Sequence, residues 1–248
     1  MDKGECLMTD HLVIKMMTSE SPHWRCLHRG LLPLDGIDQR PVDDDLPWGR
    51  YYHRNRKLIT KLTQRYGSCA VLALDDDKII GHLRFYPSAV WNMKGAGYLC
   101  LQQDFPGGPG DDFADRDFPT REQLNEQTLK VHCLMTGSPA QAENPYQRQG
   151  IATTLVKTLI GWAKTNDWQS IEADSFEDLP LIYESTGNAG RTFWEKLGFK
   201  IADRFPHPQL CDYPEFAAQL KEQAKSAGVD VNKACDSILM RLELAERS

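Results

Sequence analysis

The chain has 248 residues, of which 41% are hydrophobic and 26% are charged, and its formal net charge is −6. This length suits one large domain or two small ones, and the composition is that of an ordinary globular protein. The negative charge argues against nucleic acid as a partner. No apolar run approaches the ~20 residues that a membrane helix needs, so we expect no membrane partner.

Seven cysteines are scattered along the chain, and none of them form a C-x-x-C motif. An odd number of cysteines without that motif favours reduced thiols over a disulfide framework or a zinc site. Residues 1–6 lack the basic and then apolar pattern of a secretory signal. We therefore expect a cytoplasmic protein.

The first predicted elements are a strand and a helix. Residues 11–17 have the apolar pattern of a strand, and Ser21-Pro22 favours the start of a helix that ends near residue 30. Residues 31–49 carry proline and glycine breaks together with the acidic run 43–45. This composition predicts a loop.

A basic helix and a hairpin are predicted next. Residues 51–66 favour a helix rich in arginine and lysine, which Gly67 would end. This helix most simply presents a solvated face, and attraction of an anionic ligand is the alternative. Two apolar runs, 69–74 and 78–86, flank three consecutive aspartates, which is typical of a β-hairpin.

Residues 91–127 form a long segment between two predicted strands. It contains the Pro- and Gly-rich stretch 106–110 and the acidic run 111–117. A loop of this length is usually functional or disordered. The acidic run is most simply a solvated surface, and the alternatives are a metal site or a charge complement for a cationic substrate.

The second half of the chain alternates strands and helices without an internal repeat. The predicted elements are a strand at 128–135, a helix from 151, a strand at 170–175, a strand from 200, a helix at 213–227 and a strand at 237–244.

The most informative stretch is residues 144–152, where a turn runs directly into a helix. The apolar residues that follow share one helical face, and they are Ile151, Leu155, Val156, Leu159, Ile160 and Ala163. The first turn of a helix has N–H groups without intrahelical partners, and these groups attract phosphate. Gly150 has no side chain, so a ligand can approach its backbone closely. The stretch therefore predicts an anion site fixed to a buried helix.

Two sequence blocks carry a family resemblance. Gln147-x-x-Gly150-x-Ala152 resembles the acyl-CoA pyrophosphate loop of the GNAT N-acetyltransferase superfamily. Residues 193–199, followed by an apolar strand, resemble the same family's aromatic helix that ends in Gly-Phe. The resemblance covers residues 129–205.

The resemblance implies an α/β (α+β) GNAT fold, in which helices flank a mixed central sheet. One domain would cover residues 1–248, with an insertion at 91–127 and a C-terminal extension at 206–248. Acetyl-CoA or CoA would be the co-substrate, and no metal is implied.

The resemblance also implies which residues hold the co-substrate. Backbone N–H groups of the loop would bind the pyrophosphate, the end of the 128–135 strand would polarise the thioester carbonyl, and Asn188 would cap a helix beside the CoA arm. The predicted cofactor-binding residues are Met135, Gln147, Arg148, Gln149, Gly150, Ile151, Ala152, Thr153 and Asn188. Residues 137–143 separate the strand from the loop more widely than in most of the family.

The general base has several candidates. His132 lies on the strand before the loop, and an imidazole pKa near ~6.5 suits a base. Glu172 and Asp174 are rivals that share one face of the next strand. Cys133 would be either a covalent acceptor or a small core residue.

The acid that protonates the leaving thiolate is also open. Many family members have a tyrosine where this chain has Trp194, whose indole donates a hydrogen bond but cannot transfer a proton at neutral pH. Tyr183 is the substitute that we predict, with a packed loop tyrosine as the alternative. The predicted catalytic set is therefore His132, Glu172 and Tyr183.

The predicted function is transfer of an acetyl or other acyl group from acyl-CoA to a primary amine, by direct nucleophilic attack. The acceptor would be a small molecule or a peptide. One alternative is a catalytically weak acyl-CoA-binding sensor or scaffold, and a weaker one is an interaction protein that docks through residues 91–127. A homodimer is an open alternative to a monomer.

Overall fold

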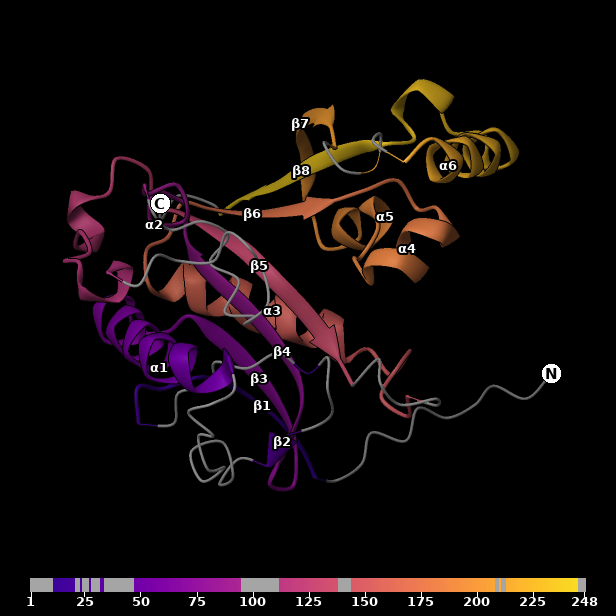
Figure 1. Ribbon diagram of the computed structural model, residues 1–248. Helices are drawn as coiled ribbons and strands as arrows, with labels where there is room; N and C mark the ends of the chain where they lie inside the picture. The colour runs from indigo at the N-terminus through magenta and orange to yellow at the C-terminus, as the bar shows by residue number, and fades with distance from the viewer. Residues whose placement is uncertain are drawn as a thin grey trace. The chain divides into compact units, whose positions relative to one another are not determined.

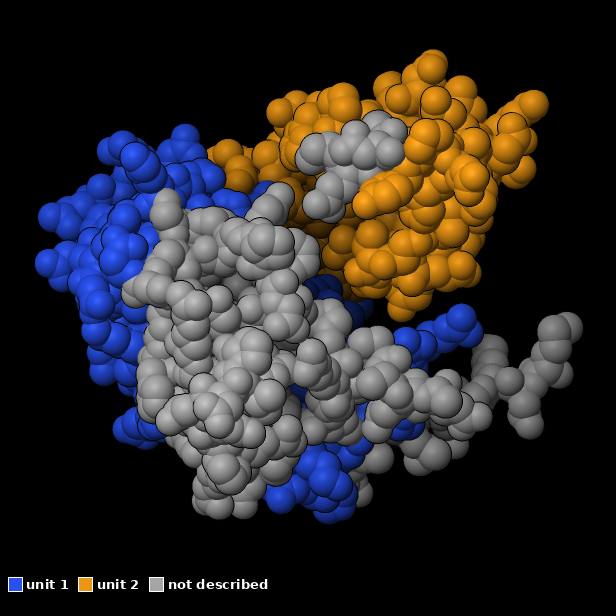
Figure 2. All heavy atoms as spheres, viewed as in Figure 1, with its two compact units in different colours: residues 1–167 blue, residues 168–248 orange. Residues whose placement is uncertain are grey.

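The computed structural model divides the chain into two compact units, residues 1–167 and 168–248 (Figure 2). The described residues are 11–20, 23, 27, 32–33, 47–94, 112–137, 144–207, 210 and 213–244. Most of the predicted helix at 21–30, the acidic run 43–45 and the stretch 106–110 lie outside them. The single domain stays a prediction.

The first unit is built on an antiparallel sheet (Figure 1). Its strands follow the spatial order β1 (Leu12–Met16), β3 (Ala70–Asp75), β4 (Lys78–Pro87) and β5 (Thr128–Thr136), and β2 (Leu32–Pro33) also pairs with β4. Most positions of β3 and β4 are buried, which explains their nearly continuous apolar sequences. The predicted hairpin is confirmed, and its turn places Asp76 at a φ of 51°.

The basic helix α1 (Pro47–Tyr66) begins earlier than the sequence predicted. Loop had been predicted for residues 47–49, and this was wrong because Pro47 suits the first turn of a helix, where its missing N–H costs nothing. The stop at Gly67 is confirmed, since Gly67 has a φ of 87°. Among the described residues no helix is both long and apolar enough to cross a membrane.

Helix α3 (Ile151–Thr165) packs against the sheet of the first unit. The predicted apolar face is buried at every position except Ile160, which is half-buried. The ring centroids of Trp162 and Phe85 lie 5.3 Å apart, and a Cβ added to Gly81 would meet Ile151. Gly81 and Phe85 therefore lie on the face of β4 that meets α3. Because side chains alternate along a strand, His82, the residue after Gly81, lies on the opposite face.

The second unit has a three-stranded antiparallel sheet with the last strand in the middle. β8 (Asp236–Glu243) pairs with β6 (Ser170–Ser175) on one side and with β7 (Lys200–Pro206) on the other. The helices are α4 (Pro180–Thr186), α5 (Arg191–Glu195), α6 (Pro214–Ala227) and the 3-10 turn η4 (Val231–Lys233). The α/β class is confirmed.

A separate apolar cluster holds the helices of the second unit together. Its buried members are Phe176, Leu179, Ile182, Leu210, Leu220, Ala224, Ala234 and Cys235. Ile182 comes from α4, which was not predicted because its 7 residues, about two turns, give too short an apolar pattern.

Candidate functional site

The loop before α3 is anchored to the sheet by one asparagine. The Asn144 Nδ2 donates to the carbonyl of Thr136, 2.8 Å away at the end of β5. The Asn144 Oδ1 accepts from the N–H of Tyr146 at 3.1 Å, and its carbonyl accepts from the N–H of Gln147 at 3.2 Å. These bonds fix the turn that leads into the helix.

The two ends of the intervening segment 137–143 lie together. A Cβ added to Gly137, whose φ is 67°, would clash with the Asn144 side chain. The N–H of Gly137 donates to the carbonyl of Ile80 at 2.6 Å. The loop that begins at Asn144 therefore lies directly beside the end of β5.

The loop is tied to β3 as well. The Tyr146 hydroxyl donates to the Asp75 Oδ2 at 2.9 Å. Partial burial and this carboxylate raise the pKa of Tyr146 above its usual value of 10.0, so the phenol stays a neutral donor. The loop thus has an anchor on each of two strands.

Backbone N–H groups gather where the loop becomes α3. Arg148 and Gly150 have φ of 61° and 78°, which is the left-handed region. A left-handed residue next to right-handed ones turns successive backbone N–H groups towards one point, and such a concavity, called a nest, binds anions. The first bond of the helix joins the N–H of Thr154 to the carbonyl of Gly150 at 3.0 Å. Within the described part of the chain, the N–H groups of residues 148–153 have no hydrogen-bond acceptor. We call residues 147–153 the cradle.

The electrostatics of the cradle favour an anion. The first turn of α3 has no acidic residue, and residues 147–150 are exposed. A Cβ added to Gly150 would meet no atom within 4 Å, so there is open space beside this glycine. The positive end of the helix dipole and the N–H groups can therefore face a phosphate.

A β-bulge positions the candidate residues of β5. Arg84 pairs with Cys133 and Phe85 pairs with Val131, so His132 is the extra residue. The His132 ring lies 5.2 Å from that of Trp91 in the short helix α2 (Ser88–Trp91) and 6.0 Å from that of Tyr86. His132 is half-buried, as is Met135, the strand partner of His82.

The predicted carboxylate of the second unit is already in an ion pair. The Glu172 Oε1 lies 3.4 Å from the Arg241 Nη1 on the neighbouring strand, and the Glu172 side chain is 15% exposed. A carboxylate held by a guanidinium has fewer lone pairs available for a substrate proton. Asp174 is exposed on the same face.

Tyr183 lies within α4, and Asn188 lies just beyond its C-terminal end. Tyr183 is 55% exposed, and its carbonyl accepts from the N–H of Gly187. The prediction that Asn188 caps the following helix was wrong, because α5 begins after Gly190. The Asp178 Oδ2 does this instead, since it accepts from the N–H of Thr192 at 3.0 Å.

Trp194 belongs to the core of the second unit. It is 2% exposed, and its ring lies 5.1 Å from Phe199 and 5.2 Å from Phe193 in edge-to-face contacts. Burial among aromatic rings explains the large side chain at this position. The structure thus gives Trp194 a packing role.

The acidic run neutralises the basic helix. Asp115, in the 3-10 turn η2 (Phe113–Asp115), pairs with Lys57, and this hydrogen bond lowers the pKa of Asp115. Lys61 donates to the carbonyl of Arg116 and lies 4.0 Å from Asp117. Within the described residues no group of three metal-ligating side chains is found. Asp115 and Asp117 therefore each face a lysine of α1.

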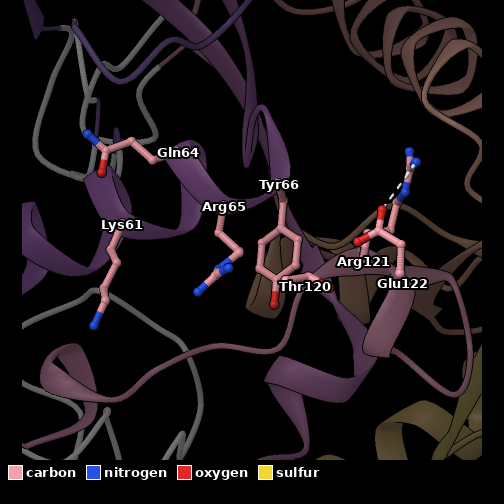
Figure 3. A pocket seen from close by; sticks show the side chains of 7 residues that line it. All are labelled: Lys61, Gln64, Arg65, Tyr66, Thr120, Arg121 and Glu122. Atoms are coloured by element: carbon pink, nitrogen blue, oxygen red, sulfur yellow. Dashed lines mark ion pairs between the residues drawn. The ribbon is translucent and has the colours of Figure 1, made fainter.

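A basic pocket of about 510 Å³ lies between α1 and the 3-10 turn η3 (Arg121–Gln123), as Figure 3 shows. Its cations are Lys61, Arg65 and Arg121, and Glu122 is its acid. Arg121 donates to the carbonyl of Asn166, which caps the C-terminus of α3. The cradle lies at the other end of α3, roughly 22 Å away at 1.5 Å per residue, so the pocket is separate from it. The pocket was not predicted, although Lys57, Lys61 and Arg65 recur every fourth residue along α1.

The predicted site residues are thus divided between the two units. The cradle residues, His132 and Met135 belong to the first unit, and Glu172, Tyr183 and Asn188 belong to the second. Asn144, Tyr146 and His82 were not predicted. The first could have been suspected, because asparagine frequently bonds to the backbone two residues further on.

Comparisons with known proteins find similarity at the level of structure. No protein-family model and no curated protein match the chain. Similar solved structures include Ard1 from Thermoplasma volcanium, with 9% identity, a TM-score of 0.45 and coverage of 95% of this chain and 99% of that one. A GNAT family acetyltransferase from Elizabethkingia anophelis with acetyl-CoA bound has 16% identity, a TM-score of 0.42 and coverage of 95% and 100%.

The ribosomal-protein-S18-alanine N-acetyltransferase from Escherichia coli is also similar, with 12% identity, a TM-score of 0.42 and coverage of 96% of each chain. Identities and scores this low leave the activity to be argued from the residues of this chain.

Proposed function

We propose that the protein is an acyl-CoA-dependent N-acetyltransferase of the GNAT type. The observation that carries this proposal is the cradle, in which unpaired N–H groups and two left-handed residues precede a helix whose apolar face is buried. The motif from Gln147 to Ala152 that resembles the family's pyrophosphate loop is the same stretch of chain.

The cradle fits a pyrophosphate in charge and in shape. The N–H groups of residues 148–153 would supply hydrogen bonds, and the first turn of α3 has no carboxylate to repel the ligand. Arg148 adds a cation beside the loop. When bound, acyl-CoA supplies a thioester that an amine can attack, and the protein's task is to hold and orient it.

We propose His132 as the base that takes the amine proton. It is half-buried on β5, in the same unit as the cradle, whereas Glu172 is engaged by Arg241. Tyr183 is proposed as the group that returns a proton to the leaving thiolate, because its exposed phenol has the chemistry that Trp194 lacks. The acyl group passes directly to a primary amine of a small molecule or a peptide.

Binding of acetyl-CoA by three glycine variants tests the proposal. Gly150→Glu should abolish binding in calorimetric titration because a carboxylate enters the cradle. Gly150→Ala adds the same left-handed strain without the charge, so it should weaken binding much less. Gly161→Glu is the matched control, since this glycine lies further along α3 and a Cβ there meets nothing within 4 Å. Binding that survives in Gly150→Glu would place the CoA site elsewhere.

A weak acyl-CoA sensor is the second candidate. The packing of Trp194 favours it, because a core tryptophan occupies the position where many relatives have the acid. The two candidates share acetyl-CoA binding and differ in turnover. Release of CoA thiol in the presence of a panel of primary amines identifies the enzyme, and binding without release by any amine supports the sensor.

A further inference from the structure

A thiol and two imidazoles form a chain on the first unit. The Cys133 Sγ lies 3.5 Å from the His82 Nε2, and the His82 Nδ1 lies 3.4 Å from the His23 Nε2. The two imidazole ring centroids are 5.3 Å apart. Both histidines are fully buried, while Cys133 is half-buried. We call these three residues the relay.

The fold holds each member of the relay in place. His82 and Cys133 meet because the bulge sets the register between β4 and β5, with Arg84 opposite Cys133. The N–H of His23 donates to the Met17 Sδ at 3.1 Å, just beyond β1. The three side chains thus come from distant segments of sequence and converge on one sheet.

The geometry has the form of an activated nucleophile. A nucleophilic site needs a base within reach of the nucleophile and a third group that orients the base. When the His82 Nδ1–H donates to His23, the His82 Nε2 lone pair faces the thiol of Cys133. The imidazole can then take the thiol proton and hold the resulting thiolate as an ion pair.

We propose that Cys133, His82 and His23 form a nucleophilic relay through which the Cys133 thiolate accepts an acyl group from a thioester. The choice of acyl-CoA as the natural donor of this group rests on the proposed function. The reaction is one of the chain itself with the donor, and it is additional to the direct transfer to an amine. Cys133 would be an acylation site, and His82 the base beside it.

The exchange is balanced without any further reactant. The Cys133 sulfur bonds to the carbonyl carbon, and the bond from that carbon to the donor sulfur breaks. The departing thiolate takes the proton from the His82 Nε2. One thioester and one thiol give acyl-Cys133 and the free thiol of the donor.

Acylation of the whole protein by two donors tests the relay. The donors are acetyl-CoA and S-acetyl-N-acetylcysteamine, a small thioester without phosphates, and peptide mass mapping locates the acetyl group. We expect acetylation of Cys133 that neutral hydroxylamine removes, and at least a tenfold slower reaction in His82→Gln. Cys69 and Cys235 are internal controls, because both are buried and burial raises the pKa of the Cys69 thiol to about 11.

The two donors separate the relay from the proposed function. Acetylation by the small thioester without acetylation or binding of acetyl-CoA would support the relay and overturn the CoA site. Binding of acetyl-CoA with no acetylation of Cys133 by either donor would overturn the relay alone. Equal acetylation rates in the wild type and a folded His82→Gln would overturn the role of His82.

A second measurement on the wild type avoids any folding defect of the variant. The rate of Cys133 alkylation by iodoacetamide is followed between about pH 5 and 9, where a free thiol has its midpoint near ~8.5. We expect a midpoint at least about one pH unit lower. The other titratable or charged groups on β4 and β5 are Lys78, Arg84, Tyr86, Lys130 and His132. A midpoint at or above that of a free thiol would contradict the relay.

Discussion

Asn144 uses both ends of its side-chain amide to position the cradle. Its Nδ2 reaches the carbonyl of Thr136 and its Oδ1 reaches the N–H of Tyr146, so one residue joins β5 to the turn before α3. The cradle geometry depends on this residue although Asn144 lies outside residues 147–153. A change at Asn144 therefore acts on ligand binding through the backbone.

Asn144→Ala should lower both stability and acetyl-CoA affinity. Two hydrogen bonds are lost, and the Thr136 carbonyl loses its donor, which costs about 1–3 kcal/mol. Urea unfolding measures the stability and calorimetric titration measures the affinity. Asn144→Asp is the comparison variant, because it keeps the acceptor for Tyr146 but replaces the donor with a negative charge beside the Thr136 carbonyl, so it should weaken acetyl-CoA binding at least as much. Unchanged acetyl-CoA affinity in Asn144→Ala would show that this anchor does not shape the cradle.

At the scale of elements, α1 and residues 112–123 act as one layer. Phe113 and Phe118 are buried with their rings in edge-to-face contact, and Lys57 and Lys61 bond to the segment from α1. The described end of the insertion is therefore packed structure. The sequence predicted α1 and the acidic run separately, but the pairing between them depends on contacts more than 50 residues apart in sequence.

Tyr66 gives this layer a measurable pH dependence. Its hydroxyl donates to the carbonyl of Pro119 at 2.8 Å, and burial raises its pKa from 10.0 to about 12. The folded state favours the neutral phenol. The contribution of Tyr66 to the free energy of unfolding is therefore full below pH 10 and is lost as the pH rises from 10 towards 12. Urea titrations give the free energy of unfolding of the wild type and of Tyr66→Phe. The wild-type value minus the variant value should be constant below pH 10 and should fall above it. A difference that grows above that pH would contradict this assignment.

The elements that the sequence predicted are those with long, regular patterns. The hairpin and α3 were predicted because the runs 69–74 and 78–86 and the apolar face of α3 are unambiguous. Helix α4 is too short for such a pattern, and the position of β8 between β6 and β7 is a tertiary pairing. Local sequence carries no information on that pairing.

For the molecule as a whole, the predicted chemistry is divided between the two units. The first holds the cradle, His132 and the relay, and the second holds Glu172 and Tyr183. The cradle could be predicted because glycine and a helix start lie together in sequence. The relay could not, because His23, His82 and Cys133 meet only through strand register and chain folding.

The central claim is that the cradle binds the pyrophosphate of CoA, and thermal unfolding of the whole chain tests it most directly. The midpoint is measured with acetyl-CoA, with CoA and with S-acetylpantetheine, which lacks the pyrophosphate. We predict that acetyl-CoA and CoA raise the unfolding midpoint saturably, by the equivalent of ~2.7 kcal/mol at a hundredfold excess over the Kd. S-acetylpantetheine should raise the midpoint much less. No shift at millimolar acetyl-CoA, or equal shifts with all three ligands, would contradict the claim.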